Sequence, residues 1–334
     1  MTIIFSEEVD LSTNHVMNWF IYKNRRVKRY NGKTSFTGHN SFEFNNRKFS
    51  IHLDKESESQ INFSNEEDEE NITSLWFRRP YNAVDDITVD IEGEEFLFPD
   101  LEILRSIGFN YKIFKDFFVT KFCNRCLGSY FVTGLNKPFT LELAKKTGLL
   151  IPNTIITNSK NDVVEFFLVN NQSIIRKALH EAFRYIPEND NFWISNKTVL
   201  IDKIEKIPDA FGPSIFQEHI KKMYEIRCFY LDGEFYSSCI FSQKNSKTQI
   251  DFRNYDSTKP NRIVPYKLLK DIENKLTELM VMLKLNTGSI DIIRAQNGEY
   301  IFLEVNPVGQ YGFISEKCNF NLDYKIFKYL SDEK

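Results

Sequence analysis

The sequence is most informative at residues 288–307, which read GSIDIIRAQNGEYIFLEVNP. An Asn-Gly pair between two β-rich runs predicts the turn of a hairpin. Residues two apart in a strand face the same side, so Glu304 and Asn306 project together, and Asp291 on the opposing strand can join them. Two carboxylates and an amide oxygen suit Mg²⁺ bridging nucleotide phosphates better than Zn²⁺. We therefore predict a magnesium site on this hairpin.

The composition of the whole chain is that of a soluble globular protein. Its 334 residues carry 43 Lys plus Arg and 46 Asp plus Glu, for a net charge of −3, and 42% are apolar. The length predicts two or three domains. No apolar run approaches the ~18 residues of a membrane span, and the balanced charge argues against a partner as acidic as nucleic acid. The amino terminus shows no secretion signal, so we expect a cytoplasmic protein.

The five cysteines are scattered along a long chain, which predicts free thiols rather than a disulfide framework. Cys123 and Cys126 have the spacing of a metal or redox pair. No second Cys or His pair follows at the distance that a zinc site needs. We expect two thiols on a helix.

The first part of the chain predicts an α/β lobe. A strand at 2–6, a helix at 13–23 and a strand at 27–30 make a β-α-β opening. An aromatic strand closed by Pro follows at 74–80, and 96–131 shows helical spacing over about two helices.

The rest of the chain predicts a second lobe and then a region dense in strands. Pro138 suits a first helical turn, Gly148 can end that helix, and a strand follows from Pro152. The other predicted elements are strands at 173–179, 198–201, 214–220, 225–231, 234–242, 287–294 and 299–305, and a helix at 266–285.

Two polar segments interrupt these elements. Residues 54–70 carry eight acids and one Lys, which predicts a solvated loop, with a docking site for a basic peptide as the alternative. Residues 180–197 are polar and aromatic, so they fit a hairpin or a mobile loop.

Asp291 followed by Leu303-Glu304-Val305-Asn306-Pro307 resembles the metal-binding end of the ATP-grasp ligases. The resemblance implies an α/β protein with α+β lobes and the ATP-grasp fold. It divides the chain into an N-terminal pre-ATP-grasp domain at 1–115, a central subdomain with leader and nucleotide contacts at 116–215, and a C-terminal subdomain with the metal site at 216–334. It also implies ATP and Mg²⁺ as cofactors.

The same resemblance assigns the nucleotide contacts. Lys177 lies on the strand whose Lys reaches the phosphates, although Ala178 stands where many members have Pro and Arg176 can compete for this role. Residues 217–220 resemble the hinge strand whose backbone reads adenine. The full cofactor-binding set is Lys137, Lys177, Gln217, Glu218, Ile220 and the ribose-binding acid Glu225.

A closer resemblance is to the graspetide synthetases, ATP-grasp enzymes that cross-link side chains of ribosomal precursor peptides. The matching stretches are WFRRP (76–80), NKP (136–138) with GLLIP (148–152), EIR (225–227), DFR (251–253) and NPVGQYG (306–312). The residue pattern at the amino terminus is similar to that of members that act on peptides of the grasp-with-spasm type.

One departure bears on the catalytic residues. Ser289 stands where some ATP-grasp ligases carry an Arg that steadies the transferred phosphate. The resemblance therefore assigns that task to Arg227 and Arg253. Asp251 is either the base that accepts the nucleophile's proton or the ion-pair partner of Arg253.

The implied activity is ATP-dependent formation of side-chain esters or amides in a ribosomal peptide. A peptide carboxylate takes the γ-phosphate, and a Lys amine or a Ser or Thr hydroxyl then displaces phosphate. The implied partners are a precursor peptide, leader plus core, and further copies of the chain in a homo-oligomer. Candidates for leader docking are 180–197 and the acidic run at 66–70, with plain connectors as the alternative.

Two other functions remain open. One is an ATP-grasp ligase that adds an amino acid or amine to a peptide. The other is a nucleotide-binding module without catalysis, against which the retention of Asp291, Glu304 and Asn306 argues.

Overall fold

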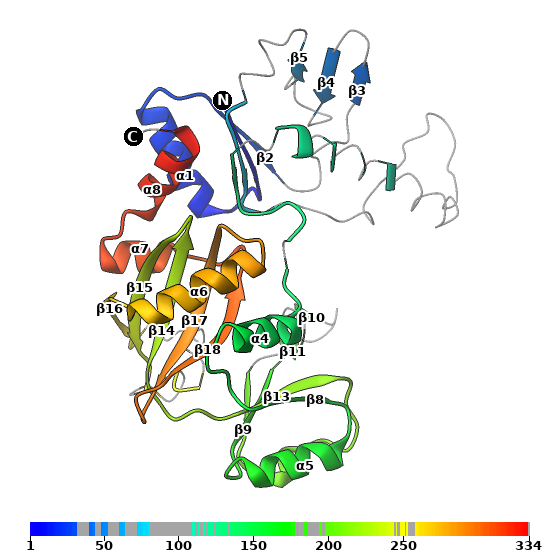
Figure 1. Cartoon of the computed structure of the whole chain (residues 1–334), viewed down its shortest axis with the longest axis vertical. Helices are drawn as coiled ribbons and strands as arrows, with labels where there is room; N and C mark the ends of the chain where they lie inside the picture. The colour runs from blue at the N-terminus through cyan, green and yellow to red at the C-terminus, as the bar shows by residue number, and fades with distance from the viewer. Residues whose placement is uncertain are drawn as a thin grey trace. The chain divides into compact units, whose positions relative to one another are not determined.

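The computed structural model of this chain describes residues 1–31, 40–43, 48–52, 60–63, 72–79, 109–110, 113, 116–117, 119–122, 125–132, 134–177, 179, 184–185, 194–195, 198–243, 245, 248–250, 252 and 258–332. By their contacts they form two compact units. Unit 1 comprises Met1–Thr133, Gln310–Gly312 and Asn321–Lys334, and unit 2 comprises Gly134–Gly309 and Phe313–Phe320. Figure 1 labels the helices and strands. The division into three domains stays a prediction.

Unit 1 is built on a parallel sheet in the order β2-β1-β6-β7. The predicted β-α-β opening and the aromatic strand are confirmed. The elements are β1 (Thr2–Ser6), α1 (Leu11–Tyr22), β2 (Val27–Asn31), β6 (Ser74–Phe77), β7 (Cys126–Leu127) and α8 (Leu322–Ser331). Every residue of β1 and β6 is buried, as expected of strands covered on both faces.

The last helix of the chain packs on the first one. Phe20 of α1 and Phe327 of α8 meet edge to face, with ring centroids 4.8 Å apart. The carbonyl of Leu330 accepts a hydrogen bond from the Ser74 hydroxyl at 2.7 Å. Figure 1 shows the blue and red helices side by side. The carboxyl-terminal segment is therefore part of the core of unit 1.

Two predictions about unit 1 are wrong in part. Within the acidic segment, Gln60–Phe63 form a strand, β5, in an antiparallel sheet with β3 (Asn40–Glu43) and β4 (Lys48–His52). Cys126 lies in strand β7 and is disulfide-bonded, so it is neither helical nor a free thiol. Cys228, Cys239 and Cys318 are free and buried, as predicted.

The first half of unit 2 is an antiparallel four-stranded sheet in the order β12-β9-β13-β8. Its strands are β8 (Thr154–Thr157), β9 (Ile174–Lys177), β12 (Val199–Ile201) and β13 (Ser214–Glu218), with helices α4 (Lys137–Lys146) and α5 (Lys160–Val169) and the 3₁₀ turn η2 (Ile204–Lys206). Helix α4 begins where Asn136 accepts a hydrogen bond from the Phe139 amide at 3.1 Å. Gly148 ends it with φ of +79°, as predicted.

The predicted hairpin at 180–197 is confirmed where it is described. Strands β10 (Arg184–Tyr185) and β11 (Ile194–Ser195) pair antiparallel. The acidic run at 66–70, the other candidate for leader docking, lies outside the described residues.

The second half of unit 2 is an antiparallel five-stranded sheet in the order β16-β15-β14-β17-β18. Its elements are β14 (Lys222–Leu231), β15 (Glu234–Phe241), β16 (Arg262–Tyr266), α6 (Lys270–Met282), β17 (Thr287–Ala295), β18 (Tyr300–Asn306) and α7 (Gly312–Cys318). Asp232 and Gly233 form the turn between β14 and β15, with φ of 45° and 94°, the two left-handed residues of this hairpin turn type. Helix α6 lies across this sheet in Figure 1.

Candidate functional site

One pocket of unit 2 collects most of the residues predicted to bind nucleotide and metal. It is lined from the four-stranded and the five-stranded sheet of the unit. Of the predicted set, it contains Lys177, Gln217, Glu218, Ile220, Glu225, Asp291 and Glu304. Ile175, Ile292 and Leu303 contribute apolar side chains to the wall of the pocket. Apolar walls with a few converging polar groups are typical of small-ligand sites.

Strand β9 presents Lys177, and not Arg176, to the pocket. Ile175 and Lys177 both line it, as residues two apart on a strand share a face. The register with β13 places Ile175 opposite Gln217, which also lines the pocket. Arg176 therefore projects from the opposite face, which favours the alignment that gives Lys177 the phosphate role.

The hinge between the sheets is held by its own hydrogen bonds. The Glu218 carboxylate accepts from the Asn153 amide N–H at 2.9 Å, and Gln217 Nε2 donates to the Thr154 hydroxyl at 3.1 Å. His219 Nδ1 lies 3.0 Å from the Ser173 hydroxyl. Burial, and then the nearby lysines 222 and 221, lower the pKa of His219. These hydrogen bonds thus hold the side chains of three of the four residues in the segment 217–220.

Arg227 is paired with a predicted metal ligand. It lies opposite Asp291 across β14 and β17, and its Nη1 donates to both carboxylate oxygens at 2.8 and 2.9 Å. Both residues are 7% exposed. Arg227 is not among the described residues that line the pocket, and its guanidinium contacts the Asp291 carboxylate from the neighbouring strand. A carboxylate has about four lone-pair positions, which leaves Asp291 capacity for a cation.

The predicted metal ligands share one face of the sheet. Asp291 lies opposite Glu304, and Asn306 lies opposite Ser289. Residues opposite in an antiparallel pair share a face, so the three oxygen-bearing side chains lie on one face of the sheet, and of the three Asp291 and Glu304 line the pocket. Within the described part of the chain no group of three or more His, Cys, Asp or Glu is arranged to hold a metal. Two carboxylates and an amide fit a hard cation such as Mg²⁺.

The turn after Asn306 is closely packed. Asn306 Oδ1 accepts from the Val308 amide at 3.0 Å, and its carbonyl accepts from the Gly309 amide at 3.1 Å. A Cβ on Gly309 would lie 2.4 Å from the Cβ of Ser289. The small residue at 289, where some ligases carry Arg, thus fits a turn that lies directly against it.

Three predicted residues within the described part of the chain, Lys137, Arg227 and Asn306, do not line the pocket. Lys137 is the first residue of α4 and is not among the described residues lining the pocket. Asp251 and Arg253 lie outside the described residues. Their roles stay proposals.

Two residues that the sequence did not single out contact Glu225, and of the two Lys222 also lines the pocket. Lys222 forms an ion pair with Glu225, and the Ser242 hydroxyl donates to the same carboxylate. Spacing gave no signal for Ser242, which is 17 residues from Glu225. Lys222 is three residues from Glu225, and regular strand spacing would place them on opposite faces.

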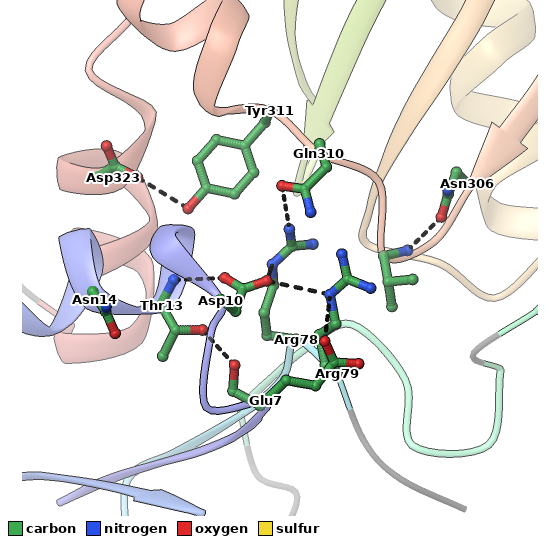
Figure 2. Close-up of polar contacts among 12 residues, drawn as sticks. Glu7, Asp10, Thr13, Asn14, Arg78, Arg79, Asn306, Gln310, Tyr311 and Asp323 are labelled. Atoms are coloured by element: carbon green, nitrogen blue, oxygen red, sulfur yellow. Dashed lines mark hydrogen bonds and ion pairs between the residues drawn. The ribbon is translucent and has the colours of Figure 1, made fainter. Parts of the chain in front are cut away.

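Unit 1 holds a separate buried network of polar side chains, shown in Figure 2. Arg78 and Arg79 lie 3.3 and 3.2 Å from one oxygen of Asp10, which also caps α1. Arg78 donates to Gln310 at 3.1 Å, and its guanidinium lies over the ring of Tyr311. Burial opposes ionisation of Asp10, but the two arginines and the Thr13 amide together lower its pKa. Arg78 of the stretch at 76–80 therefore meets Gln310 and Tyr311 of the stretch at 306–312.

The fold is that of solved ATP-grasp proteins. The chain matches a Chryseobacterium gregarium RiPP-associated ATP-grasp ligase in complex with ADP and a leader and core peptide, with a TM-score of 0.74 and 21% identity over 99% of this chain and 95% of that one. It matches the macrocyclase MdnC bound with precursor peptide MdnA from Microcystis aeruginosa MRC, with a TM-score of 0.71 and 20% identity over 100% of both chains. D-alanyl-alanine synthetase A from Vibrio cholerae matches at 0.54 and 11% identity, over 99% and 98%.

No protein-family model and no curated protein matches the sequence. At these identities the likeness establishes the fold, so the chain has the ATP-grasp fold that the sequence predicted. Among the residues that the structure describes, no helix is both long and apolar enough to cross a membrane.

Proposed function

We propose that this protein is an ATP-dependent ligase that forms ester or amide cross-links between side chains of a ribosomal precursor peptide. The observation that carries the proposal is the pocket of unit 2, which brings Lys177, Glu225, Asp291 and Glu304 together from two sheets. The likeness over whole chains to ligases solved with leader and core peptides supports the substrate class.

The first step is activation of a peptide carboxylate, whose oxygen is otherwise a poor leaving group. The carboxylate oxygen attacks the γ-phosphorus of ATP, giving an acyl phosphate and ADP. Lys177 faces the phosphates and offsets charge on the transferred group. Mg²⁺ bound by Asp291, Glu304 and Asn306 would supply charge stabilisation on the β- and γ-phosphates.

The second step forms the cross-link. A Lys amine or a Ser or Thr hydroxyl of the same peptide attacks the acyl carbon, and phosphate leaves with the bonding electron pair. Asp251 accepts the proton of the nucleophile or orients Arg253, and Arg227 holds Asp291 in place through two hydrogen bonds.

The test is Mg²⁺-dependent ADP formation that requires an acidic precursor peptide. Glu304→Gln and Asn306→Ala should abolish peptide-dependent ADP release while the circular dichroism spectrum is retained. Glu299→Gln is the matched control, because Glu299 is an exposed acid at the turn of the same hairpin. Full activity in Asn306→Ala removes the metal assignment.

The proposal also includes the cellular location, the oligomeric state, the domain division and the leader contacts. A cytoplasmic location suits an enzyme that consumes ATP, and buried free thiols at 228, 239 and 318 are compatible with it. The resemblance supports a homo-oligomer. It also supports the three-domain division and leader contacts in the central subdomain, where β10 and β11 pair.

A further inference from the structure

An ion pair lies in the wall of the pocket, beside the residues proposed to bind nucleotide. Lys222 and Glu225 both line the pocket, and their side chains are only 7% and 10% exposed. Lys222 Nζ donates to Glu225 Oε1. Desolvation offsets most of the attraction in a buried pair, so stability alone gives a weak account of two charges here.

A bulge in β14 brings the two side chains together. The pairing of β14 with β17 shifts its register between Lys222 and Tyr224. Such a bulge adds one residue to the strand and re-aims a side chain. Lys222 and Glu225 can therefore face the same side although they are three residues apart. Met223, the residue inside the bulge, is exposed.

The two side chains that donate hydrogen bonds to the Glu225 carboxylate both contact the same oxygen. The Ser242 hydroxyl donates to Oε1 at 2.9 Å, on the same oxygen that Lys222 contacts. Oε2 accepts no hydrogen bond from the part of the chain that the structure describes. Lys222 is itself held by the carbonyl of Ile250 at 3.2 Å. One oxygen of this pocket-lining carboxylate is thus fixed, and no described donor contacts the other.

We propose that Lys222 and Ser242 are positioning residues that fix Oε1 of Glu225, so that Oε2 accepts a hydrogen bond from a sugar hydroxyl of the bound nucleotide. The inference rests on the proposed function, because it takes the pocket as the nucleotide site. Lys222 acts through Glu225 and makes no contact of its own with the nucleotide. A site built to pair with a hydroxyl discriminates against a ligand that lacks it, because the buried acceptor is left unpaired.

The experiment measures equilibrium binding of ATP, 2′-deoxy-ATP and 3′-deoxy-ATP by calorimetry. The wild-type protein should bind at least one deoxy analogue about tenfold or more weakly than ATP, the effect of one hydrogen bond to a charged group. Lys222→Met should weaken ATP binding to nearly the level of that analogue and leave the analogue's own affinity unchanged. Lys221→Met, in the exposed neighbouring residue, is the matched control.

A double-mutant cycle tests whether Lys222 affects nucleotide binding through Glu225. Glu225→Gln should lose the same discrimination, and adding Lys222→Met to it should cause no further loss, because the two act through one contact. The double variant also removes both charges, so it avoids leaving Glu225 buried without its partner. If Lys222→Met alone does not fold, Ser242→Ala takes its place with the same expected loss of discrimination.

Two results overturn the inference. One is an equal loss of ATP and deoxy-ATP binding in Lys222→Met that persists in the Glu225→Gln background, which would make Lys222 a direct phosphate ligand. The other is unchanged discrimination in both Lys222→Met and Ser242→Ala. A wild-type protein that binds no ATP contradicts the proposed function itself, and it is recognised before any variant is compared.

Discussion

At the scale of single residues, the faces of strand β9 determine which cation faces the pocket that we propose to bind nucleotide. Lys177 lines the pocket and Arg176 lies on the other face. Lys177→Ala should therefore weaken ATP binding by about tenfold or more, the effect of one charge-assisted contact. Arg176→Ala is the matched control and should leave the affinity within about twofold, since Arg176 lies on the face of the strand away from the pocket. Calorimetric titration with ATP measures the affinity of both variants. A larger effect in Arg176→Ala would move the phosphate-facing role from Lys177 to Arg176.

Sequence reasoning located the residues whose chemistry follows from local spacing. Alternation in a strand places Glu304 with Asn306, and the hairpin adds Asp291, without knowledge of the fold. It could not locate Lys222 with Glu225, because their shared face depends on a bulge. Nor could it foresee that Arg227 lies against Asp291, because that pairing depends on the register between β14 and β17.

At the scale of elements, the turn after β18 depends on Gly309. A Cβ there would lie 2.4 Å from Ser289 Cβ and 2.6 Å from its Oγ, a distance that real Cβ contacts do not show. Gly309→Ala should destabilise the folded protein by about 1–3 kcal/mol, as overpacking in a closely packed site does. Urea unfolding measures the change. Gly212→Ala, with nothing within 4 Å of the new Cβ, is the control.

A second substitution tests the cause of that loss. Ser289→Gly removes both nearest atoms, so the double variant Gly309→Ala and Ser289→Gly should recover part of the stability. Only part is expected, because the Asn306 carbonyl would still lie 3.1 Å from the new Cβ. An additive loss in the double variant would show that the contact with Ser289 is not responsible.

The elements that sequence patterns missed are mostly short or lack strong end signals. Strand β16 (Arg262–Tyr266) was not predicted, and only its last residue falls within the helix predicted at 266–285. Helix α8 was overlooked although its buried residues Leu322, Ile326 and Leu330 recur every four positions. Its importance depends on packing against α1, which no local pattern reveals.

At the scale of the whole molecule, helix α8 belongs to the core of unit 1, and the pocket that we propose to bind nucleotide lies in unit 2. Phe327 is fully buried against Phe20 in unit 1, whereas the pocket lies in unit 2. Phe327→Ala should lower the free energy of unfolding by about 3–5 kcal/mol. The folded variant should bind ATP within about twofold of the wild type. Lys328→Ala on the same helix is the control, and an unchanged unfolding midpoint in Phe327→Ala would contradict the placement of α8 in the core.

The measurement that tests the central claim most directly is mass spectrometry of an acidic precursor peptide after incubation with this protein, ATP and Mg²⁺. The peptide is one encoded beside the gene and rich in Glu or Asp together with Thr, Ser or Lys. The account predicts one ADP released and one water lost from the peptide per cross-link, with Glu304→Gln producing neither. A product heavier by a joined amino acid or amine would instead show a ligase of the alternative kind. ADP release without any change in peptide mass would contradict cross-linking.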